Sequence, residues 1–535
     1  MQTFMKHRNE FGGANRVLVA LRARDGNMFS PAFFDALRQA TDAVFFIDGV
    51  DRSRVSSLFT PNVRFTEVVE DGIAGGNVVP ADFQPTAAGL EQVRKNILKS
   101  GIVGRLVAND FSAAIISAEL IEIDPQTGEK IDFIEVGHQL EELRDQFEND
   151  LIEVNIIGYA KVISDIADGA KRVIVFFIGA FFLSGGLVYL FTRSHRVTAM
   201  ATICSLIAVI WQLGMLTWLG FGIDPMGILV PFLIYAIAIS HGVQMITANR
   251  AAIFNGEDYL TAARKSFRRL LLPGGVALIS DTVGFITIML IDIEVIQQMA
   301  VTASFGVATV IFTNLILLPV LLSYIGFPAD YRQRLHDRIE RTDRLWKHVS
   351  RIAEPWPAAA LIVLAVVLLV FGARHASEIK IGDLHQGVPE LRPSSRYNLD
   401  SKAITEHFSI GVDILNVIVE TVPDGCIEYD VMENIDRFVW QLSNTAGVQS
   451  VIALPGIAKV INAGWSEGAL KWRVLPRNRQ VLVEAVQYIP TSSGLLNADC
   501  STMPVMIFTK DHKAETIAQV VETIKAYRKE NATER

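Results

Sequence analysis

Residues 173–191 read VIVFFIGAFFLSGGLVYLF and contain no charged side chain. A helix needs about 20 predominantly apolar residues to cross the hydrocarbon core of a bilayer, so this stretch predicts a membrane span. Stretches of the same character follow at residues 197–219, 226–247, 270–291, 300–325 and 357–371. The sequence therefore predicts an α-helical transmembrane bundle with six spans.

The composition supports a membrane protein and argues against several other classes. Half of the 535 residues are hydrophobic and the mean hydropathy is +0.32, which is high for a soluble protein of this length. The formal net charge of −8 argues against a nucleic-acid partner. The sequence has neither a glycine-rich phosphate loop nor a metal-ligand cluster, so we expect no cofactor, no metal and no enzymatic activity.

The chain has three cysteines, which are too few for a disulfide scaffold. Cys426 and Cys500 fall in the same polar region and can form one disulfide if that region is extracytoplasmic. Reduced thiols are an equally good interpretation, and Cys204 lies inside the second predicted span.

Basic residues alternate between the connections of the predicted spans. The connections at 220–225 and 292–298 contain no lysine or arginine, whereas 326–355 is strongly basic. Other basic connections carry Arg193, Arg196, Arg250, Arg264, Lys265, Arg268 and Arg269. The positive-inside rule places the basic connections in the cytoplasm and both large polar regions outside. We expect the basic connections to form amphipathic helices on the inner membrane face or, equally, solvated charged helices.

The two polar regions show the same alternation of strands and helices. In the first we expect strands at 16–23, 54–60, 111–124 and 151–162, with helices at 31–45 and 133–149. In the second we expect strands at 412–422, 446–456 and 503–510, with helices at 429–445 and 515–530. This pattern predicts α+β domains built from ferredoxin-like β-α-β units.

The order of these segments resembles the RND (resistance-nodulation-cell division) superfamily, and most closely its MMPL-like exporters. The resemblance rests on four stretches: FGIDPMGILVPFLIYAIAISHGVQM (221–245), ALISDTVGFITI (277–288), ASFGVATVIFTNLILLPVLL (303–322) and LRPSSRYNLDSKAI (391–404). Members of that superfamily have two similar halves, each with one helix, an extracytoplasmic porter domain and a block of five helices. The five-helix block is also called a sterol-sensing domain.

The resemblance implies a domain plan for the whole chain. Residues 1–170 correspond to a first porter domain whose preceding helix is missing, and 171–325 to the five-helix block. A basic cytoplasmic linker (326–355) and a helix opening the second half (356–373) follow, and 374–535 is an incomplete second porter domain. We therefore expect the chain to be part of a longer, multi-pass protein of the bacterial inner membrane, with its porter domains on the periplasmic side.

Four polar residues in the spans are candidates for proton coupling. The family usually carries an Asp followed by a Tyr on the third helix of this block, and the alignment puts Ser240 and His241 at those positions. A carboxylate at a helix centre costs roughly 2.5–3.5 kcal/mol, so Asp281 needs a partner. His241 is the expected partner, at an offset on the order of 5 Å along the helices, and Ser240 and Gln244 would complete the hydrogen bonds.

Structural roles remain open for the same residues. His241 can be a neutral ring that bonds a backbone carbonyl or Gln244 and holds helices together. Asp281 can stay protonated or cap a helix distortion near Gly284. Intramembrane ionisable groups are functional by default, which favours the coupling role.

The resemblance implies export of hydrophobic or amphiphilic, lipid-like molecules, driven by the proton-motive force. A lipid- or sterol-responsive membrane sensor or scaffold without transport is the alternative, favoured by the absence of the usual Asp. The expected partners are lipid-like small-molecule substrates and membrane lipids, with a homo-oligomer as an open alternative.

Overall fold

The computed structural model of this chain describes residues 6–7, 15–69, 72–123, 128–222, 227–324, 347–385, 387–411, 413–466 and 468–531. The chain forms two compact units. One, here called the α+β unit, comprises Met1–Ile166 with Lys380–Arg535, and the other, the helical unit, is Ala167–Ile379.

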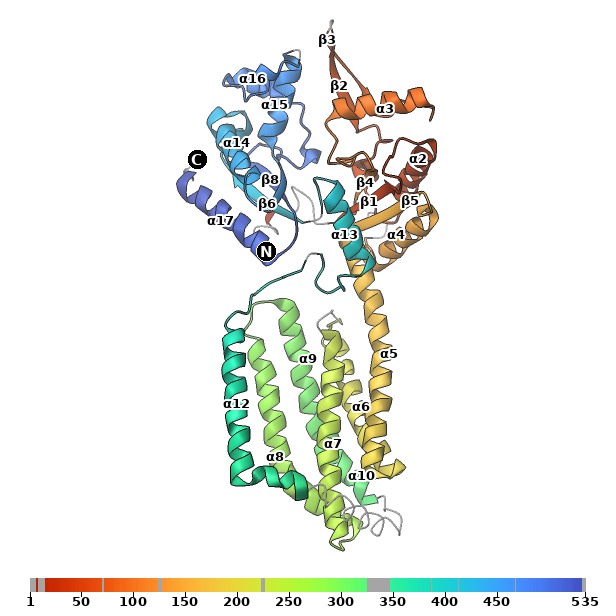
Figure 1. The fold of residues 1–535 in the computed structure, drawn as a ribbon, viewed down its shortest axis with the longest axis vertical. Coiled ribbons are helices and arrows are strands. Elements are labelled where there is room, and N and C mark those ends of the chain that lie inside the picture. The colour runs from red at the N-terminus through yellow and green to blue at the C-terminus, as the bar shows by residue number, and fades with distance from the viewer. Residues whose placement is uncertain are drawn as a thin grey trace. The chain divides into compact units, whose positions relative to one another are not determined.

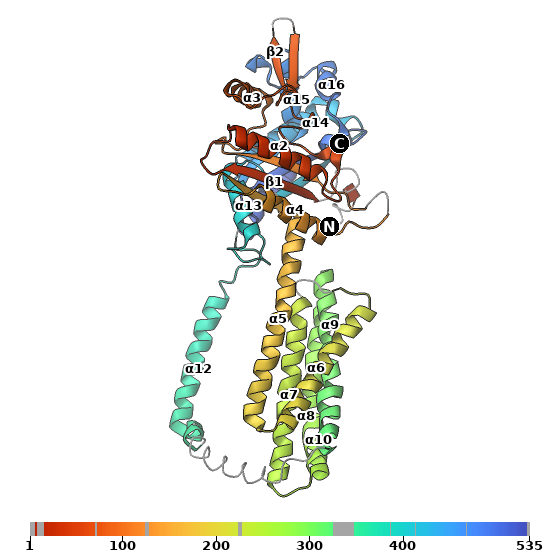
Figure 2. The same ribbon diagram turned by 90° about the vertical axis from the view of Figure 1, so that its right-hand side faces the viewer.

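The helical unit contains the predicted spans. Its helices are α5 (Tyr159–Thr192), α6 (His195–Trp218), α7 (Val230–Phe254), α8 (Tyr259–Ile288), α9 (Glu294–Val310), a π-helical stretch (Ile311–Leu317), α10 (Leu318–Tyr324) and α12 (Pro355–Ala376) (Figure 1). Within the described residues, six helical stretches are long and apolar enough to cross a membrane, as predicted. Helix α12 has no buried residue and stands apart from the α5–α10 bundle (Figure 2).

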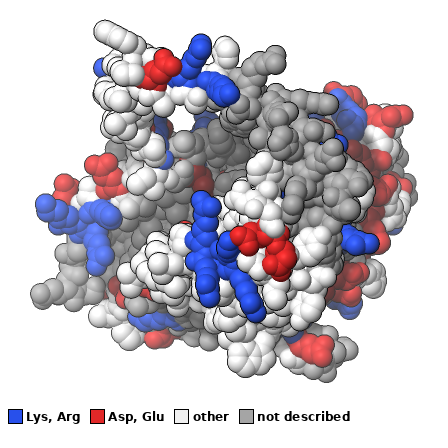
Figure 3. All heavy atoms as spheres, turned by 90° about the horizontal axis from the view of Figure 1, so that it is seen from below, with Lys and Arg blue, Asp and Glu red and all other residues white. Residues whose placement is uncertain are grey.

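The basic connection between α7 and α8 differs from the expectation. Helix α7 ends at Phe254, and α8 begins at Tyr259, where the Asp258 side chain accepts a hydrogen bond from the Thr261 N–H. The basic residues 264–269 are therefore the first turns of a membrane helix and form no separate surface helix. Figure 3 shows lysine and arginine side chains exposed on the face seen from below. Residues 325–346, which hold most of the predicted basic linker, lie outside the described part of the chain.

The first half of the α+β unit contains a three-stranded antiparallel sheet in the order β4-β1-β5. Its strands are β1 (Arg16–Ala23), β4 (Ala113–Glu119) and β5 (Ile152–Gly158), and helices α2 (Pro31–Phe45) and α4 (Phe133–Phe147) connect them as predicted. Helix α3 (Ala87–Ser100) and a hairpin, β2 (Arg64–Val69) and β3 (Gly72–Asn77), were not predicted.

The strand predicted at 54–60 is wrong. This segment makes one isolated bridge to β4, between Ser56 and Ser117. Beyond that bridge the Thr60 side chain accepts from the Ser57 N–H, at 2.9 Å, and donates to the Ser57 carbonyl. Such local side-chain bonds satisfy backbone groups that a strand would offer to the sheet, so the pairing stops.

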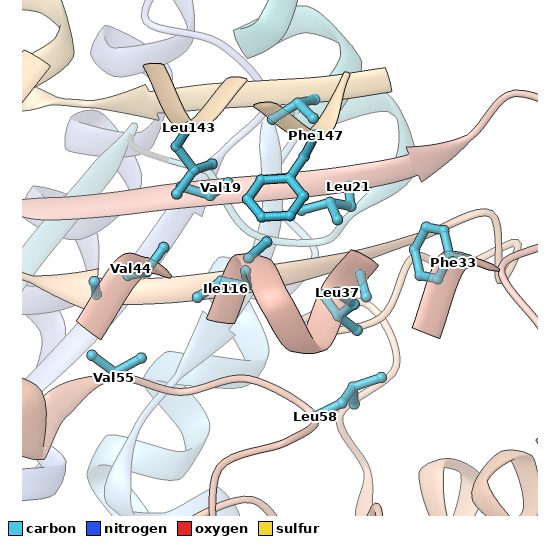
Figure 4. Close-up of a cluster of buried hydrophobic side chains, with 14 of the residues drawn as sticks. Val19, Leu21, Phe33, Leu37, Val44, Val55, Leu58, Ile116, Leu143 and Phe147 are labelled. Carbon is cyan, nitrogen blue, oxygen red and sulfur yellow. The ribbon is translucent and has the colours of Figure 1, made fainter. Parts of the chain in front are cut away.

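Both faces of the first sheet are buried, because alternate residues of β1 point to opposite sides. Val19 and Leu21 face α2 and α4 in a core that also contains Leu37 and Phe147 (Figure 4). On the other face, Leu18 packs in a cluster with Tyr397, Ile404 and Phe408, which come from α13 (Arg396–His407) and the residue after it. A helix from the second half of the chain therefore covers the sheet of the first half.

The second half has its own three-stranded antiparallel sheet, in the order β6-β8-β7. Strands β6 (Ile414–Glu420), β7 (Val448–Ile452) and β8 (Thr502–Thr509) and helices α14 (Tyr429–Ser443) and α17 (Ala514–Asn531) confirm the predicted alternation. Helices α15 (Leu454–Trp465) and α16 (Arg479–Val486) are additions, and a disulfide joins Cys426 to Cys500. The ferredoxin-like arrangement stays a prediction, because each of these described sheets has three strands.

Candidate functional site

His241 lies in the middle of α7 and is 9% exposed. Its Nδ1 is 3.0 Å from the Ile237 carbonyl oxygen of the preceding turn. A carbonyl oxygen can only accept, so Nδ1 carries a proton and the lone pair of a neutral ring is on Nε2. No hydrogen bond joins Nε2 to any other described residue, so Nε2 remains able to take up a proton.

Two glycines bring neighbouring helices close to His241. A Cβ added to Gly274 of α8 would be 3.7 Å from the His241 Cδ2 atom and 3.1 Å from Leu315 of the π-helical stretch. A Cβ added to Gly242 would be 3.2 Å from the Asn314 amide nitrogen. Small residues at these positions let the helices approach closely, as is typical inside membranes. The His241 ring therefore lies between α7 and α8, beside the π-helical stretch.

Asn314 links that stretch to two other helices. Its amide nitrogen donates to the Ser205 hydroxyl of α6, at 3.1 Å, and to the Ala238 carbonyl of α7. Its amide oxygen accepts from the Thr313 hydroxyl at 2.9 Å, and Asn314, Thr313 and Ser205 are all fully buried. His241 and Asn314 thus bond successive carbonyls of α7, those of Ile237 and Ala238. π-Helical turns recur at functional sites.

The structure does not bring Asp281 to His241. The Asp281 carboxylate is exposed and makes no hydrogen bond or ion pair with another described residue. It lies seven positions after Gly274, which is nearly the same face of α8 but about 10 Å farther along the helix. The offset of about 5 Å expected from the predicted span ends was too small, because those ends did not reveal which residue of α8 lies opposite His241.

The other two candidates lie at the margin of the site. The Ser240 hydroxyl donates to the Ile237 carbonyl at 2.8 Å and is 3.5 Å from the His241 Nδ1 atom. Gln244 is exposed, and its side-chain amide makes no hydrogen bond to His241 or to other described residues. The hydrogen bond of His241 to the Ile237 carbonyl is the kind expected if His241 had a structural role. The same bond leaves Nε2 free of hydrogen bonds to described residues, so it is also compatible with proton coupling.

Two buried amides of the bundle were missed by the sequence reasoning. Gln212 of α6 and Asn249 of α7 are each 1% exposed, and neither amide has a hydrogen-bond partner among the described residues. Gln212 packs against Gly306 of α9, where an added Cβ would be 3.1 Å from its Cγ atom. An amide in an apolar span is the signal that could have identified both residues.

Comparison with known families agrees with the arrangement of the spans. A model of the MMPL family matches residues 91–360, which is about half of the chain and includes α5 to α10 and the start of α12. No curated protein matches the chain significantly. Within the described residues, no three His, Cys, Asp or Glu side chains are placed to hold a metal ion.

Proposed function

Because the chain belongs to the MMPL family of membrane transporters, we propose that it exports hydrophobic or amphiphilic molecules from the bacterial inner membrane, driven by the proton-motive force. The observation that carries the proposal is the buried His241 ring, with Nδ1 bonded to Ile237 and Nε2 able to accept a proton. A histidine ring can hold one proton or two, as a proton-coupling residue must.

Protonation of His241 would change the packing around it. A second proton, on Nε2, places a positive charge beside Leu315 and Gly274, which offer no side-chain acceptor. A buried charge without a partner is costly, so the bundle would relieve it by moving α8 or the π-helical stretch and admitting water or an acceptor. Loss of the proton on the cytoplasmic side would restore the original packing. These two states are the alternation that a proton-driven pump needs.

Asp281 would act at a different depth from His241. Its exposed carboxylate lies about two helical turns from the level of His241, on the same face of α8. We propose that it accepts protons first and that water carries them to His241. The positive-inside rule supports this direction, because it favours a cytoplasmic start of α8 and periplasmic α+β domains.

The test is efflux of a fluorescent lysophospholipid from proteoliposomes, with and without an imposed proton gradient. His241→Ala and His241→Gln are expected to abolish the gradient-dependent part of the efflux. His195→Ala is the matched control, because His195 is an exposed ring at the start of α6. Unchanged gradient-dependent efflux in both His241 variants would refute coupling through this residue.

The alternative is a lipid- or sterol-responsive sensor or scaffold, and one observation favours it. Ser240 stands where the family usually has the Asp of its proton site, and its hydroxyl is occupied by the Ile237 carbonyl. A parent protein that binds lipid but shows no efflux in either condition would support the sensor. For either function we propose no enzymatic reaction.

A further inference from the structure

An exposed surface of the second half of the α+β unit combines large apolar side chains with cations that have no ion-pair partner among the described residues. We call it the aromatic–basic patch and define it by Trp465, Leu470, Lys471, Trp472, Arg473, Val474, Arg477 and Tyr488. The apolar members are unusually exposed, at 79% for Leu470, 65% for Tyr488 and 57% for Trp465. Large exposed apolar patches on a folded domain mark binding sites.

The backbone of the patch is held in place. The Asn462 amide nitrogen, from α15, donates to the carbonyls of Trp472 at 2.8 Å and of Val474 at 3.1 Å. Leu475, the next residue, is 9% exposed and belongs to the hydrophobic core. The folded structure therefore presents these side chains to solvent, since the segment that carries them is anchored at both backbone and core.

The aromatic rings extend the patch over two helices. Trp465, at the end of α15, and Tyr488, just after α16, have ring centroids 6.3 Å apart. Helices α15 and α16 are neighbours in Figure 1. The exposed apolar side chains therefore come from the ends of two helices as well as from the segment between them.

The segment that carries the patch is predominantly basic. Residues 465–488 contain four basic residues and two acidic ones, Glu467 and Glu484. Arg479 pairs with Glu428 at 3.2 Å. The other three, Lys471, Arg473 and Arg477, have no carboxylate within ion-pair distance among the described residues, and Lys471 lies 5.6 Å from the Trp472 ring centroid.

We propose that the aromatic–basic patch binds single molecules of an anionic amphiphile. The alkyl chain lies on Leu470, Trp472 and the neighbouring rings. Its phosphate or carboxylate headgroup is bound by Lys471, Arg473 and Arg477. The charge complementarity selects an anionic headgroup, because an apolar patch alone would accept any hydrophobic partner.

The choice of a single amphiphile as the ligand rests on the proposed export function. A pump delivers its cargo one molecule at a time, which favours a single amphiphile over a bilayer surface. The patch would then receive cargo in the α+β unit after it leaves the membrane.

The experiment uses the full chain in nanodiscs of zwitterionic lipid. Lysophosphatidylglycerol with a brominated acyl chain is added below its critical micelle concentration, and tryptophan quenching is measured against the matching brominated lysophosphatidylcholine. At low salt, lysophosphatidylglycerol is expected to bind about tenfold more tightly than lysophosphatidylcholine. This preference is expected to shrink as salt is added. No proton gradient is needed.

The variants separate the two parts of the patch. Leu470→Ser with Trp472→Ser is expected to abolish the saturable quenching by both lipids, and Lys471→Gln with Arg473→Gln and Arg477→Gln to abolish only the headgroup preference. Trp440→Ser, which removes another exposed tryptophan (71% exposed), and Lys525→Gln with Arg528→Gln and Lys529→Gln on α17 are the matched controls and should change neither. Circular dichroism checks that every variant is folded.

Three outcomes would overturn the proposal. The first is equal quenching in the patch variants and the parent. The second is the same affinity for lysophosphatidylglycerol and lysophosphatidylcholine. The third is binding to anionic vesicles without binding to monomeric lysophosphatidylglycerol. Binding with no gradient-driven efflux would refute the proposed pump alone, whereas efflux without binding would refute the patch alone.

Discussion

The Arg144 guanidinium donates to the Asp400 carboxylate, with Nη2 and Oδ2 2.7 Å apart, although 256 positions separate the two residues. Both side chains are almost fully buried, at 4% and 1% exposure. Asp400 also accepts from the Ile156 N–H of β5 and from the Arg396 Nε, each at 3.0 Å. One buried carboxylate thus fastens α13 of the second half to the sheet of the first half.

Asp400→Ala is therefore expected to destabilise the α+β unit strongly. The substitution leaves the buried Arg144 guanidinium with Glu141, 3.2 Å from its Nε atom, in place of the buried Asp400 carboxylate, and breaking a buried pair costs about 3–5 kcal/mol. Glu406→Ala is the control on the same helix, because Glu406 is exposed and 3.8 Å from Lys402, and it should cost less than about 1 kcal/mol. Urea unfolding followed by tryptophan fluorescence measures both; equal losses would contradict the buried pair.

Removal of the disulfide should also destabilise this unit. Cys426 and Cys500 are 74 positions apart, and closing a loop of that length stabilises by up to about 4 kcal/mol in the chain-entropy model. Cys426→Ser with Cys500→Ser should lower the free energy of unfolding accordingly. Thiol labelling of the denatured parent should find one free cysteine, Cys204, without reductant and three with it; three without reductant would exclude the bridge.

A pair of adjacent glycines tests the packing at His241. Gly274→Leu would push side-chain atoms against Leu315 and the His241 ring, whereas a side chain at Gly275 meets nothing within 4 Å. Overpacking costs about 1–3 kcal/mol, so Gly274→Leu should lower thermal stability and suppress gradient-dependent efflux. Gly275→Leu changes the same helix turn and should leave both near the parent values. Equal behaviour of the two variants would show that the site tolerates separation of α7 and α8.

His512 should make a small, pH-dependent contribution to stability. Its Nδ1 is 3.3 Å from the Asp413 carboxylate, and this hydrogen bond raises the pKa of His512, with help from the charges of Asp413, Asp383 and Asp511 and against a lowering by burial. A group whose pKa is raised in the folded state contributes its full stabilisation at pH values below its unfolded-state pKa. That stabilisation is lost as the pH rises through the folded-state pKa. The His512 side chain is half exposed, so screening keeps the contribution below about 1 kcal/mol.

His512→Asn is accordingly expected to lower the melting temperature more at pH 5.5 than at pH 8.5. Differential scanning fluorimetry of the two proteins across this range measures the difference. A larger effect at the higher pH would have the wrong sign for this ion pair.

Local patterns predicted the elements well and their contacts poorly. The apolar length of the spans and the alternation in β1 and β6 depend on neighbouring residues, so the six spans and six of the seven predicted strands were found. The strand at 54–60 failed because side-chain hydrogen bonds of Ser57 and Thr60 compete with the sheet. The docking of α13 on the first sheet joins distant segments, and no local periodicity encodes it.

The sequence pointed to His241 as a candidate, but it did not determine the geometry around that residue. Hydropathy finds a polar residue such as His241 in a span, yet it does not determine which residue of the next helix lies opposite. Packing of small residues sets that register, and here Gly274, two turns from Asp281, lies beside the ring. Asn314 lies on the π-helical stretch, and that stretch has no clear local signal in the sequence, so the bond of Asn314 to α7 could not be predicted.

The π-helical stretch Ile311–Leu317 also makes chain length a constraint. A π-helical turn holds more residues than an α-helical turn, and each residue turns an α-helix by about 100°. In the present structure, Leu318 of α10 packs near Gly242 of α7. Deleting one residue from the π-helical stretch would let the α-helix continue and would rotate α10, so that Leu318 would turn away from Gly242. In related sequences, a one-residue gap in this stretch would therefore indicate that α10 turns a different face toward α7, even where every polar residue is retained.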